Sequence, residues 1–530
     1  MSHYFFSMKS QFYLCNVLSY ICFCCVLIFS SCNKQANIQV VSLPDAVELT
    51  SVSKSVDVDL LIPGKIFIWG NKLIVFEQLH KDMFKVFDVN SLKYLYSFGN
   101  IGGGPEEFIS VGVNDIIENS TEFVEIFDVN KLKYVYFSDS SAHITSEIPI
   151  SLHYLKNPIN RLRKMNDSIY YFDNIFEGDS KNEFIRLNLH AGIRTYFSPY
   201  PSWVKSIKSA EQKYSTYIKS SNYNLFYDKV VVFYNRFPVI KFLDSGGNVI
   251  KEIHVDTKSS KFNDIENNKL YFVDSSVLTD EYIYVLWVEK SKNEVEKDPN
   301  NFKPEILVFD WNGNVAGRYK LDRPIVSFTL SEETGKIYCT SFPLDDIKNE
   351  IFIYDLPKID NDRMPLTRIQ NSLYSLNILD GYSFSQVSLE DGIDKIVERD
   401  GLKTNINYFS QVRDKNGFAK YDLETIKISV YTPVDEIKKD WSENFLNTNA
   451  VDKENFKRRE INIDELIVHQ TTYYHNFLNP KNKIEKIYVS SYFFEKDNVF
   501  IEISINSMKD NLSSYHPTIK KMIRSFELKN

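Results

Sequence analysis

Short apolar and aromatic runs alternate with polar turns along the first two thirds of the chain. The clearest pair is FDVNSLKYLY (Phe87–Tyr96) and FDVNKLKYVY (Phe127–Tyr136), which share eight of ten residues at an offset of 40. Each segment runs apolar up to Asp, turns through polar residues and returns in a Tyr-rich run, which is typical of a β-hairpin. Weaker copies of the pattern are anchored at Asn188, Asp244, Asp310 and Asp355.

Six copies of a hairpin predict a mainly β fold in which residues 32–358 form a six-bladed β-propeller. The shortest step between copies is close to the length of a four-stranded blade, roughly 40–45 residues, and the longer steps indicate insertions in the third, fourth and fifth blades. A propeller has to close its ring, because open terminal blades expose sheet edges. Since the sixth copy ends early, at Leu356, we expect the strand-like segment Asn37–Pro44 to complete that blade.

The glycine-rich stretch LYSFGNIGGGPEEF (Leu95–Phe108) raises the choice between a phosphate-binding loop and a corner of the chain. A phosphate loop has the form GxxxxGK[ST] and opens a helix. No Lys-Ser/Thr pair follows here, and the next segment, FISVGVNDII, reads as a strand. Glycines supply positive φ at tight reversals, so we predict a corner between the first and second blades.

The same stretch resembles the GxGPGEF corner of six-bladed, TolB-like/NHL-like β-propeller lipoproteins of Bacteroidetes-type bacteria. Glu106 stands where that family usually has Gly. The resemblance covers roughly residues 33–358 and implies the propeller fold and an exported, lipid-anchored protein. It implies little chemistry, because such proteins mostly lack an assigned reaction.

The last third of the chain has a different pattern. We expect a linker at 359–372 and then a smaller α/β domain at 373–530, an antiparallel sheet backed by helices. Helices are predicted at 388–401, with Val397 on the apolar stripe, at 432–446, with Thr432 as N-cap and Pro433 in the first turn, and near the end, in HPTIKKMIRSF. The order of elements is similar to PsbP-like α/β sandwich domains, which implies binding or assembly more readily than catalysis.

The N-terminus reads as an export signal. From Met8 the chain has one Lys, then an apolar run from Val17 to Phe29, then Ser30-Ser31-Cys32, and this order is that of a secretory signal. FSSC resembles a lipobox, so residues 1–31 are predicted to be a lipoprotein signal peptide and Cys32 the lipid attachment site. A transmembrane anchor fits less well, because the apolar run is shorter than the ~20 residues of a spanning helix.

Composition narrows the partners and the chemistry. The 530 residues carry a formal net charge of −8 without a long basic block, so nucleic acid is not an expected partner. Five of the six cysteines lie in the first 32 residues, which leaves no disulfide framework and no cysteine zinc site beyond them. Cys339, the remaining one, is expected to be a small buried hydrophobe.

No catalytic, metal-ligating or cofactor-binding set is recognisable. Of nine histidines only His469 and His475 lie close together, and their spacing matches no zinc motif. GxSxG, the nucleophile motif of serine hydrolases, does not occur. We therefore predict no catalytic residue, no metal and no cofactor.

Loops on a rigid scaffold are the usual carriers of binding function. The insertion Tyr200–Ser215 is predicted to hold a short helix through Trp203, Ile207 and Ala210, whereas the insertion Val288–Glu305 is charged and has no apolar period. A plain solvated loop is an equally good interpretation of both insertions. The candidate ligand surface consists of Trp203, Lys205, Lys208 and Tyr214.

The expected function is a non-enzymatic binding or scaffolding role at the cell envelope, carried by the rim loops of the propeller. The protein is expected to be exported and anchored through its acyl chains, at the outer membrane and facing the periplasm or the cell surface, with an unknown envelope protein or glycan as partner. The alternative is a hydrolase or lyase acting on glycan or peptide at the channel mouth, and convergent Asp, Glu, His or Arg side chains there would favour it. A third possibility is that the C-terminal domain is the working part.

Overall fold

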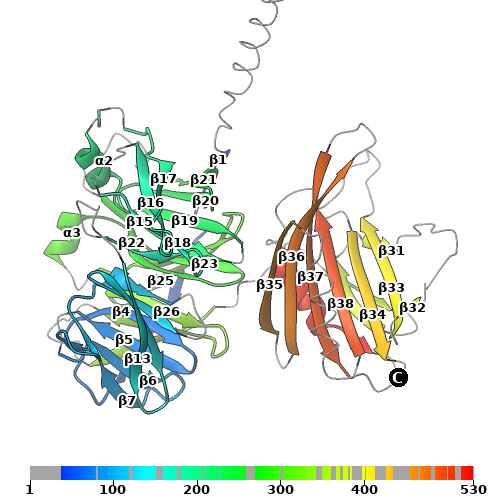
Figure 1. Cartoon of the computed structure of the whole chain (residues 1–530), viewed down its shortest axis with the longest axis horizontal. Helices are drawn as coiled ribbons and strands as arrows, with labels where there is room; N and C mark the ends of the chain where they lie inside the picture. Colours follow the sequence, from blue (N-terminus) through cyan, green and yellow to red (C-terminus); the bar gives the residue numbers. More distant parts are fainter. Residues whose placement is uncertain are drawn as a thin grey trace, which may run out of the picture.

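The computed structural model describes two β-rich parts of the chain, a propeller and a C-terminal domain (Figure 1). The described residues are 37–78, 81–118, 123–150, 159–175, 181–204, 206–207, 209–225, 227–257, 269–298, 302–341, 349–357, 359, 366–370, 374–379, 382–384, 397–399, 402–411, 425–433, 454–463, 466–478, 484–497, 499–507 and 515–528. The predicted signal peptide, residues 1–31, and the predicted lipid attachment site Cys32 lie outside them. Within these ranges no helix has the length and apolar character required to cross a bilayer.

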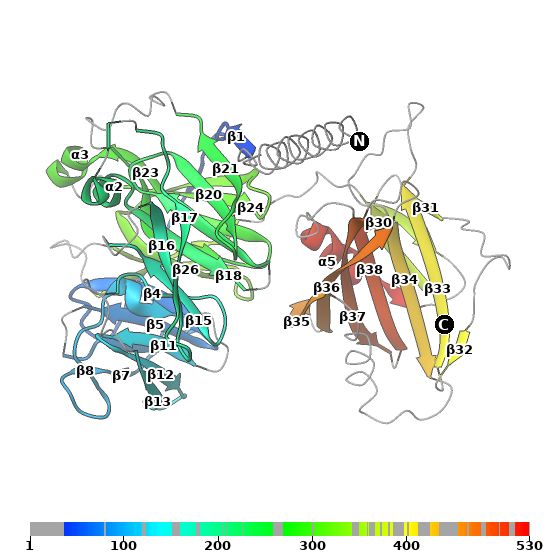
Figure 2. The ribbon, with the colours of Figure 1, turned by 45° about the horizontal axis from the view of Figure 1, so that its top comes forward.

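Six antiparallel sheets follow one another along residues 63–355, which confirms the predicted six-bladed propeller (Figures 1 and 2). The strands of the first three blades are β4 (Pro63–Trp69), β5 (Lys72–Glu77), β6 (Phe84–Asp88) and β7 (Tyr94–Phe98); β10 (Ile116–Ile117), β11 (Val124–Asp128), β12 (Lys131–Phe137) and β13 (Ala142–Pro149); β14 (Arg163–Lys164), β15 (Ile169–Asp173), β16 (Asn182–Asn188) and β17 (Arg194–Pro199). Those of the last three are β18 (Lys219–Asn224), β19 (Lys229–Tyr234), β20 (Val239–Asp244) and β21 (Val249–Val255); β22 (Lys269–Leu278), β23 (Tyr282–Ser291), β24 (Glu305–Asp310) and β25 (Val315–Leu321); β26 (Ile325–Ser331), β27 (Lys336–Ser341) and β28 (Glu350–Asp355).

The apolar cores of the propeller lie between blades. Each of six clusters of buried side chains combines residues of two neighbouring blades. One of them joins the sixth blade to the first, with Tyr338 and Ile351 packed against Ile66 and Leu73. Since apolar burial stabilises by roughly 25 cal/mol per Å², every blade depends on both of its neighbours.

The N-terminal segment runs across three blades in turn. β1 (Asn37–Val41) adds a parallel fifth strand to the fourth blade, β2 (Val47–Leu49) adds one to the fifth, and β3 (Val52–Ser55) pairs antiparallel with β28 and completes the sixth. The prediction that Asn37–Pro44 closes the ring is therefore wrong. The closing strand has to lie beside the first blade, and only seven residues, 56–62, separate β3 from β4.

The glycine-rich stretch is a corner, as predicted. It lies between β7 and β10 and holds two short parallel strands, β8 (Asn100–Ile101) and β9 (Glu107–Phe108). Gly99 has φ +83° and packs against Phe108, so a side chain there would be strained. The loop wraps a carboxylate of its own chain, because the N–H of Gly104 donates to Glu107 Oε2 at 2.7 Å.

The two closest sequence repeats adopt different positions in their blades. Phe87–Tyr96 joins the third and fourth strands of the first blade, whereas Phe127–Tyr136 joins the second and third strands of the second. In the first copy Ser91 donates its hydroxyl to Asp88 at 2.7 Å. Lys131 replaces Ser91 in the second copy, and β12 begins there directly after the turn.

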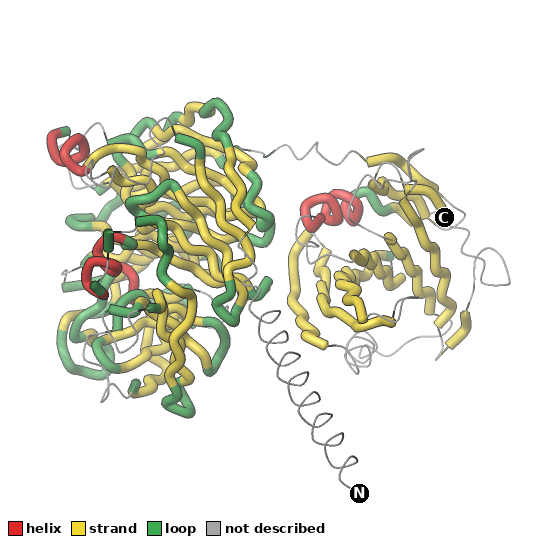
Figure 3. Tube along the Cα trace, turned by 90° about the horizontal axis from the view of Figure 1, so that it is seen from above, coloured by secondary structure: helices red, strands yellow, loops and turns green. Residues whose placement is uncertain are grey.

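Two short helices lie in the insertions, on the side of the propeller away from the C-terminal domain (Figure 3). α2 (Ala210–Thr216) is capped by Ser209, which accepts from the N–H of Gln212, so the predicted helix forms but begins only at Ala210. α3 (Lys292–Lys297) is capped in the same way by Ser291. This helix forms in a segment without an apolar period, because the Ser291–Glu294 capping box can start a helix that has no apolar stripe.

The C-terminal domain has one large antiparallel sheet, in the order β31-β33-β34-β38-β37-β36-β35, and a three-stranded sheet, β29-β30-β39. The strands are β29 (Leu366–Gln370), β30 (Tyr374–Leu379), β31 (Tyr382–Phe384), β32 (Val397–Arg399), β33 (Leu402–Gln411), β34 (Thr425–Pro433), β35 (Glu454–Ile463), β36 (Leu466–Leu478), β37 (Ile484–Lys496), β38 (Val499–Ser507) and β39 (Glu527–Leu528). The last predicted helix is confirmed as α5 (His516–Arg524), with Ile519, Met522 and Ile523 buried against the sheet.

Other predictions for this region need correction. β29 lies inside the expected linker 359–372, because this segment pairs with β30. Val397 is in β32, and Thr432 and Pro433 end β34, so strand pairing replaces the expected start of the second helix. The rest of the two predicted helices, 388–396 and 434–446, lies outside the described residues.

The position of the closing strand predicts a difference between two N-terminal truncations. A chain starting at Thr50 keeps β3 and loses only the additional strands β1 and β2, so we expect one cooperative thermal transition with a lower midpoint. A chain starting at Asp57 also loses β3, which exposes the edge of β28. We expect this chain to aggregate and to lose its cooperative unfolding transition. Circular dichroism melts check this, and equal midpoints for the two chains would contradict it.

Candidate functional site

A cavity of about 710 Å³ lies in the centre of the propeller. Its lining comes from the region of the innermost strand of every blade, β4, β10, β14, β18, β22 and β26, and from β35 of the C-terminal domain. The volume is in the range of small-molecule sites, roughly 300–1,000 Å³. The cavity therefore belongs to the ring as a whole and is covered at one mouth by the second domain.

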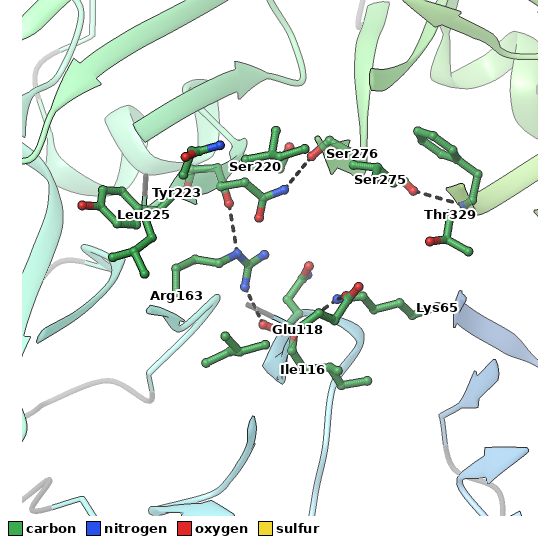
Figure 4. Close-up of a pocket in the computed structure, with 18 of the residues that line it drawn as sticks. Lys65, Ile116, Glu118, Arg163, Ser220, Tyr223, Leu225, Ser275, Ser276 and Thr329 are labelled. Atoms are coloured by element: carbon green, nitrogen blue, oxygen red, sulfur yellow. Dashed lines mark hydrogen bonds and ion pairs between the residues drawn. The ribbon is translucent and has the colours of Figure 1, made fainter. Parts of the chain in front are cut away.

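Arg163 is the central charged residue of the cavity (Figure 4). Its side chain donates to the carbonyl oxygens of Ser221 at 3.0 Å, Asn114 at 2.7 Å and Leu162 at 2.9 Å. These acceptors belong to three consecutive blades, so the guanidinium group links the inner strands. None of them is a carboxylate, but the guanidinium charge also acts on the carboxyl of Asp115, whose pKa it lowers against the larger effect of burial.

A second cation, Lys65, is compensated. Its ammonium group forms an ion pair with Glu118 and donates to the carbonyl oxygen of Ile116 at 3.1 Å (Figure 4). Glu118 is thereby engaged within the lining itself.

Hydroxyl and amide groups fill much of the remaining wall. Asn222 donates to Ser276 Oγ at 2.7 Å, and Ser327 Oγ accepts from the N–H of Ile66 at 3.1 Å, which ties the sixth blade to the first. Ser220 is different, because its buried hydroxyl has no hydrogen-bond partner. A buried hydroxyl without a partner costs about 1–3 kcal/mol, so Ser220 lowers the stability of this inner strand.

The C-terminal domain contacts the mouth of the cavity through opposite charges. Arg459 of β35 pairs with Asp280 and lies over the ring of Tyr227, with the guanidinium carbon 5.7 Å from the ring centre. Lys520 of α5 pairs with Glu281 at 3.0 Å. The propeller thus supplies carboxylates and the C-terminal domain supplies cations, an arrangement that fixes orientation.

His516 lies fully buried behind this contact. Its Nδ1 is 3.1 Å from the Tyr492 hydroxyl, and burial, together with the nearby charges of Arg459 and Lys520, holds the pKa of the imidazole well below its usual value. The ring is therefore neutral near pH 7 and acts as a packing and hydrogen-bonding group. Nothing in its position suits proton transfer to a ligand in the cavity.

The described lining lacks the parts of a general acid–base or nucleophilic site. It holds no histidine or cysteine, and its carboxylates, Glu118 and Asp280, are both ion-paired. Among the described residues no three His, Cys, Asp or Glu side chains are grouped so that they could hold a metal ion. The cavity can bind, but it shows no convergent pair for proton transfer.

The predicted ligand surface is only partly described. Trp203 is half-buried among Tyr217, Tyr234 and Phe237, and its indole N–H donates to Glu252 at 3.1 Å, so it is a packing residue. Tyr214 is half-buried and accepts from Asn160 at 3.2 Å. Lys205 and Lys208 lie outside the described residues.

The structure shows the positions of two residues singled out in the sequence, Cys339 and His469. Cys339 is fully buried in β27, as expected, and burial raises the pKa of its thiol well above the usual value. His469 is in β36, where its Nδ1 lies 3.9 Å from a carboxylate oxygen of Glu460, and it belongs to no metal-binding cluster among the described residues. The side chain of His475 lies outside the described residues.

Sequence reasoning missed the cavity residues. Arg163 belongs to a two-residue strand, β14, in a segment with no strand-like pattern. A usable signal was present in two innermost strands, where Ser220-Ser221 and Ser275-Ser276 interrupt segments that otherwise read as buried. Paired small hydroxyl residues in such strands indicate a polar channel wall rather than a core.

The family model described as TolB-like 6-blade propeller-like matches residues 44–333. Among solved structures, the calcium-binding protein regucalcin from Agrobacterium tumefaciens str. C58 is 11% identical, with a TM-score of 0.36 over 60% of this chain and 98% of regucalcin. A gluconolactonase from Xanthomonas campestris is 10% identical, with a TM-score of 0.31 over 58% of this chain and 90% of the enzyme.

A third solved structure covers a smaller share of the chain. The cyanobacterial PsbP protein of Synechocystis is 14% identical, with a TM-score of 0.19 over 31% of this chain and 92% of that protein. Each of the three TM-scores lies below 0.5, a level that carries no functional information. No curated protein matches the chain.

Asp115, beside the cavity on the 3₁₀ turn Val113–Asp115, predicts a pH-dependent stability. Burial raises the pKa of its carboxyl to about 6. Because this pKa is above the unfolded value, stability is greatest where the group is protonated and falls as the pH rises from about 4 to about 6. We expect Asp115→Asn to stabilise the protein by about 1–2 kcal/mol at about pH 7.5 and to have little effect at about pH 4.

Asp88→Asn is the matched control with the opposite sign. Hydrogen bonds from the side chain and backbone of Ser91 lower the pKa of Asp88, so its contribution is present above the unfolded pKa and is lost as the pH falls. Denaturant unfolding across this pH range measures both variants. A pH-independent effect of Asp115→Asn would contradict the assignment.

Proposed function

This chain belongs to the family of TolB-like six-bladed propellers, and from that premise we propose that it is a cell-envelope lipoprotein that binds a ligand in its central channel without transforming it. The observation that carries the proposal is the cavity of about 710 Å³ to which all six blades contribute. A cavity of this size with a few placed polar groups is the usual form of a small-molecule site.

Binding is favoured over catalysis by the state of the charged groups. Glu118 and Asp280 are held in ion pairs with Lys65 and Arg459, so neither carboxylate is free to act as a general base. The alternative, a hydrolase or lyase working on glycan or peptide, requires at least one acid–base pair facing the reacting bond. The described lining offers recognition groups instead.

The proposed cellular location is inferred from the sequence. Lipidation of Cys32 would tether the protein to a membrane, with the outer membrane as the proposed site, and five residues further on the chain enters β1 at Asn37. A short tether of this kind keeps the propeller at the membrane surface. The partner delivering or receiving the ligand would then be another envelope component, a protein or a glycan.

The substitution Cys32→Ala tests the proposed membrane location. We expect loss of acylation and a shift of the protein from the membrane fraction to the soluble fraction, measured by metabolic labelling with a fatty acid and by fractionation. Cys25→Ala is the control, because it alters the apolar stretch without touching the lipobox. Undiminished labelling of Cys32→Ala would refute lipid attachment at this residue.

Channel binding is tested by native mass spectrometry of the full protein after incubation with a small-molecule extract of the envelope. We expect one adduct per chain, recovered chemically unchanged, and its loss in Ser276→Phe, which fills the cavity. Tyr214→Ala serves as the control, because Tyr214 lies in α2 and is not part of the cavity lining. An adduct that survives Ser276→Phe and is lost in Tyr214→Ala would move the site to the loops, and a cleaved ligand would favour the enzyme.

A further inference from the structure

We propose that the outer edge of the fourth and fifth blades contacts the lipid bilayer that holds the acyl chains. The contact surface, which we call the anchor-side edge, consists of the exposed apolar side chains of Ile38 and Val40 in β1 and of Val47 in β2. The inference rests on the proposed lipidation of Cys32. It goes further, because it specifies which part of the propeller meets the membrane and names lipid as the partner of that part.

β1 is an edge strand that carries apolar residues toward solvent. It pairs in parallel with β21 and is the outermost strand of its sheet (Figures 1 and 2). Val41 is buried in the core between the fourth and fifth blades, whereas Ile38 and Val40 are 53% and 68% exposed. Successive strand residues point to opposite faces, so Ile38 and Val40 share the face that this core does not use.

β1 lacks the features that protect sheet edges in water. Exposed edge strands commonly carry charged residues or proline, which prevent pairing with other chains, whereas NIQVV contains neither. The exposed apolar surface continues on the next blade, because Val47 is 55% exposed and begins the outermost strand of the fifth sheet. An apolar edge of this kind is a hazard in water, but it suits the boundary between headgroups and acyl chains.

The proposed lipid determines what lies beside this edge. Four residues, 33–36, separate Cys32 from Asn37, the first residue of β1. The five Cα-to-Cα steps span at most roughly 18 Å, because an extended chain advances about 3.6 Å per residue. Acyl chains in the bilayer hold the lipidated residue at the headgroups, so β1 begins within that distance of the membrane surface.

Two carboxylates next to the anchor-side edge are paired within the protein. Glu48 of β2 binds Lys320 at 2.9 Å. Glu252, which is the register partner of Ile38, lies 2.5 Å from Nε2 of His254. A paired charge costs less to bring toward a low-dielectric surface than an isolated one. Apolar contact is therefore the interaction that this edge offers.

The test uses the full acylated protein, purified in detergent and reconstituted into vesicles of phosphatidylethanolamine and phosphatidylglycerol. Val40→Cys carries a fluorescent label, and nitroxide-bearing lipids in the vesicles quench labels that touch the bilayer. In the proposed mature protein no other thiol competes, because Cys32 is acylated and Cys339 is fully buried. Val129→Cys is the matched control, an exposed valine in the second blade. We expect loss of most of the fluorescence at position 40 and none at position 129.

A pair of double variants locates the contact. In a protein labelled at Val47→Cys, Ile38→Ser with Val40→Ser is expected to reduce the quenching, because the neighbouring apolar contact is lost while the acyl anchor stays. Ile101→Ser with Ile109→Ser removes two exposed apolar residues from the corner between the first and second blades and should leave the quenching unchanged. Quenching should persist at high salt, because salt screens charges and not apolar contact.

The outcomes separate this inference from the proposed anchor. A protein that does not float with the vesicles would refute both the lipid anchor and the contact. A protein that floats, but whose labels at positions 40 and 129 are quenched equally, would refute the contact and leave the anchor standing, and so would unchanged quenching in Ile38→Ser with Val40→Ser. Protection of position 40 from a water-soluble thiol reagent in native membranes, but not in vesicles, would assign the edge to a protein partner and overturn the lipid contact.

Discussion

Closure of the ring is the constraint on which the rest of the structure depends. Every apolar core of the propeller is shared between two blades, including the one between the sixth and the first, so no blade can bury its faces alone. A ring with one open seam would expose two sheet faces and the edge of β28. The short strand Val52–Ser55 therefore carries an importance far beyond its length.

Closure also determines the chemistry of the channel. Because the interblade faces take the large apolar side chains, the innermost strands present the small and polar remainder to the axis, where Ser220, Asn222 and Ser276 lie. Arg163 uses three backbone carbonyls of neighbouring blades as acceptors, so one side chain both links the strands and places a positive charge on the axis.

The sequence was sufficient for the architecture and insufficient for pairing between distant segments. Hairpins anchored at Asp88, Asp244 and Asp310 could be identified because each turn depends on neighbouring residues. The blade that β1 joins depends on where the ring leaves a free sheet edge, and the residues NIQVV do not specify that edge. The actual closing strand, VSKS, is short and exposed, so its sequence gives no strong strand signal. Local pattern predicts a strand, but only three-dimensional closure selects its partner.

The candidate site was harder to predict for a related reason. Its residues come from seven strands separated by hundreds of positions, and they are ordinary types: serine, asparagine, lysine and arginine. Trp203 was predicted to be part of the ligand surface because it is an aromatic residue in an insertion, but it packs against Tyr234. A site whose residues meet only at the axis of the ring leaves no sequence motif. What its propeller residues share is a place in or next to the innermost strand of a blade.

The C-terminal domain changes how the channel has to be understood. Its described contacts with the propeller include the ion pairs of Arg459 with Asp280 and of Lys520 with Glu281, and partly exposed ion pairs of this kind hold less tightly than an apolar interface. A ligand that touches both β35 and the channel wall binds the docked arrangement better than the undocked one. By linkage it must then stabilise docking by the same free energy, so occupancy of the channel and position of the second domain are a single equilibrium.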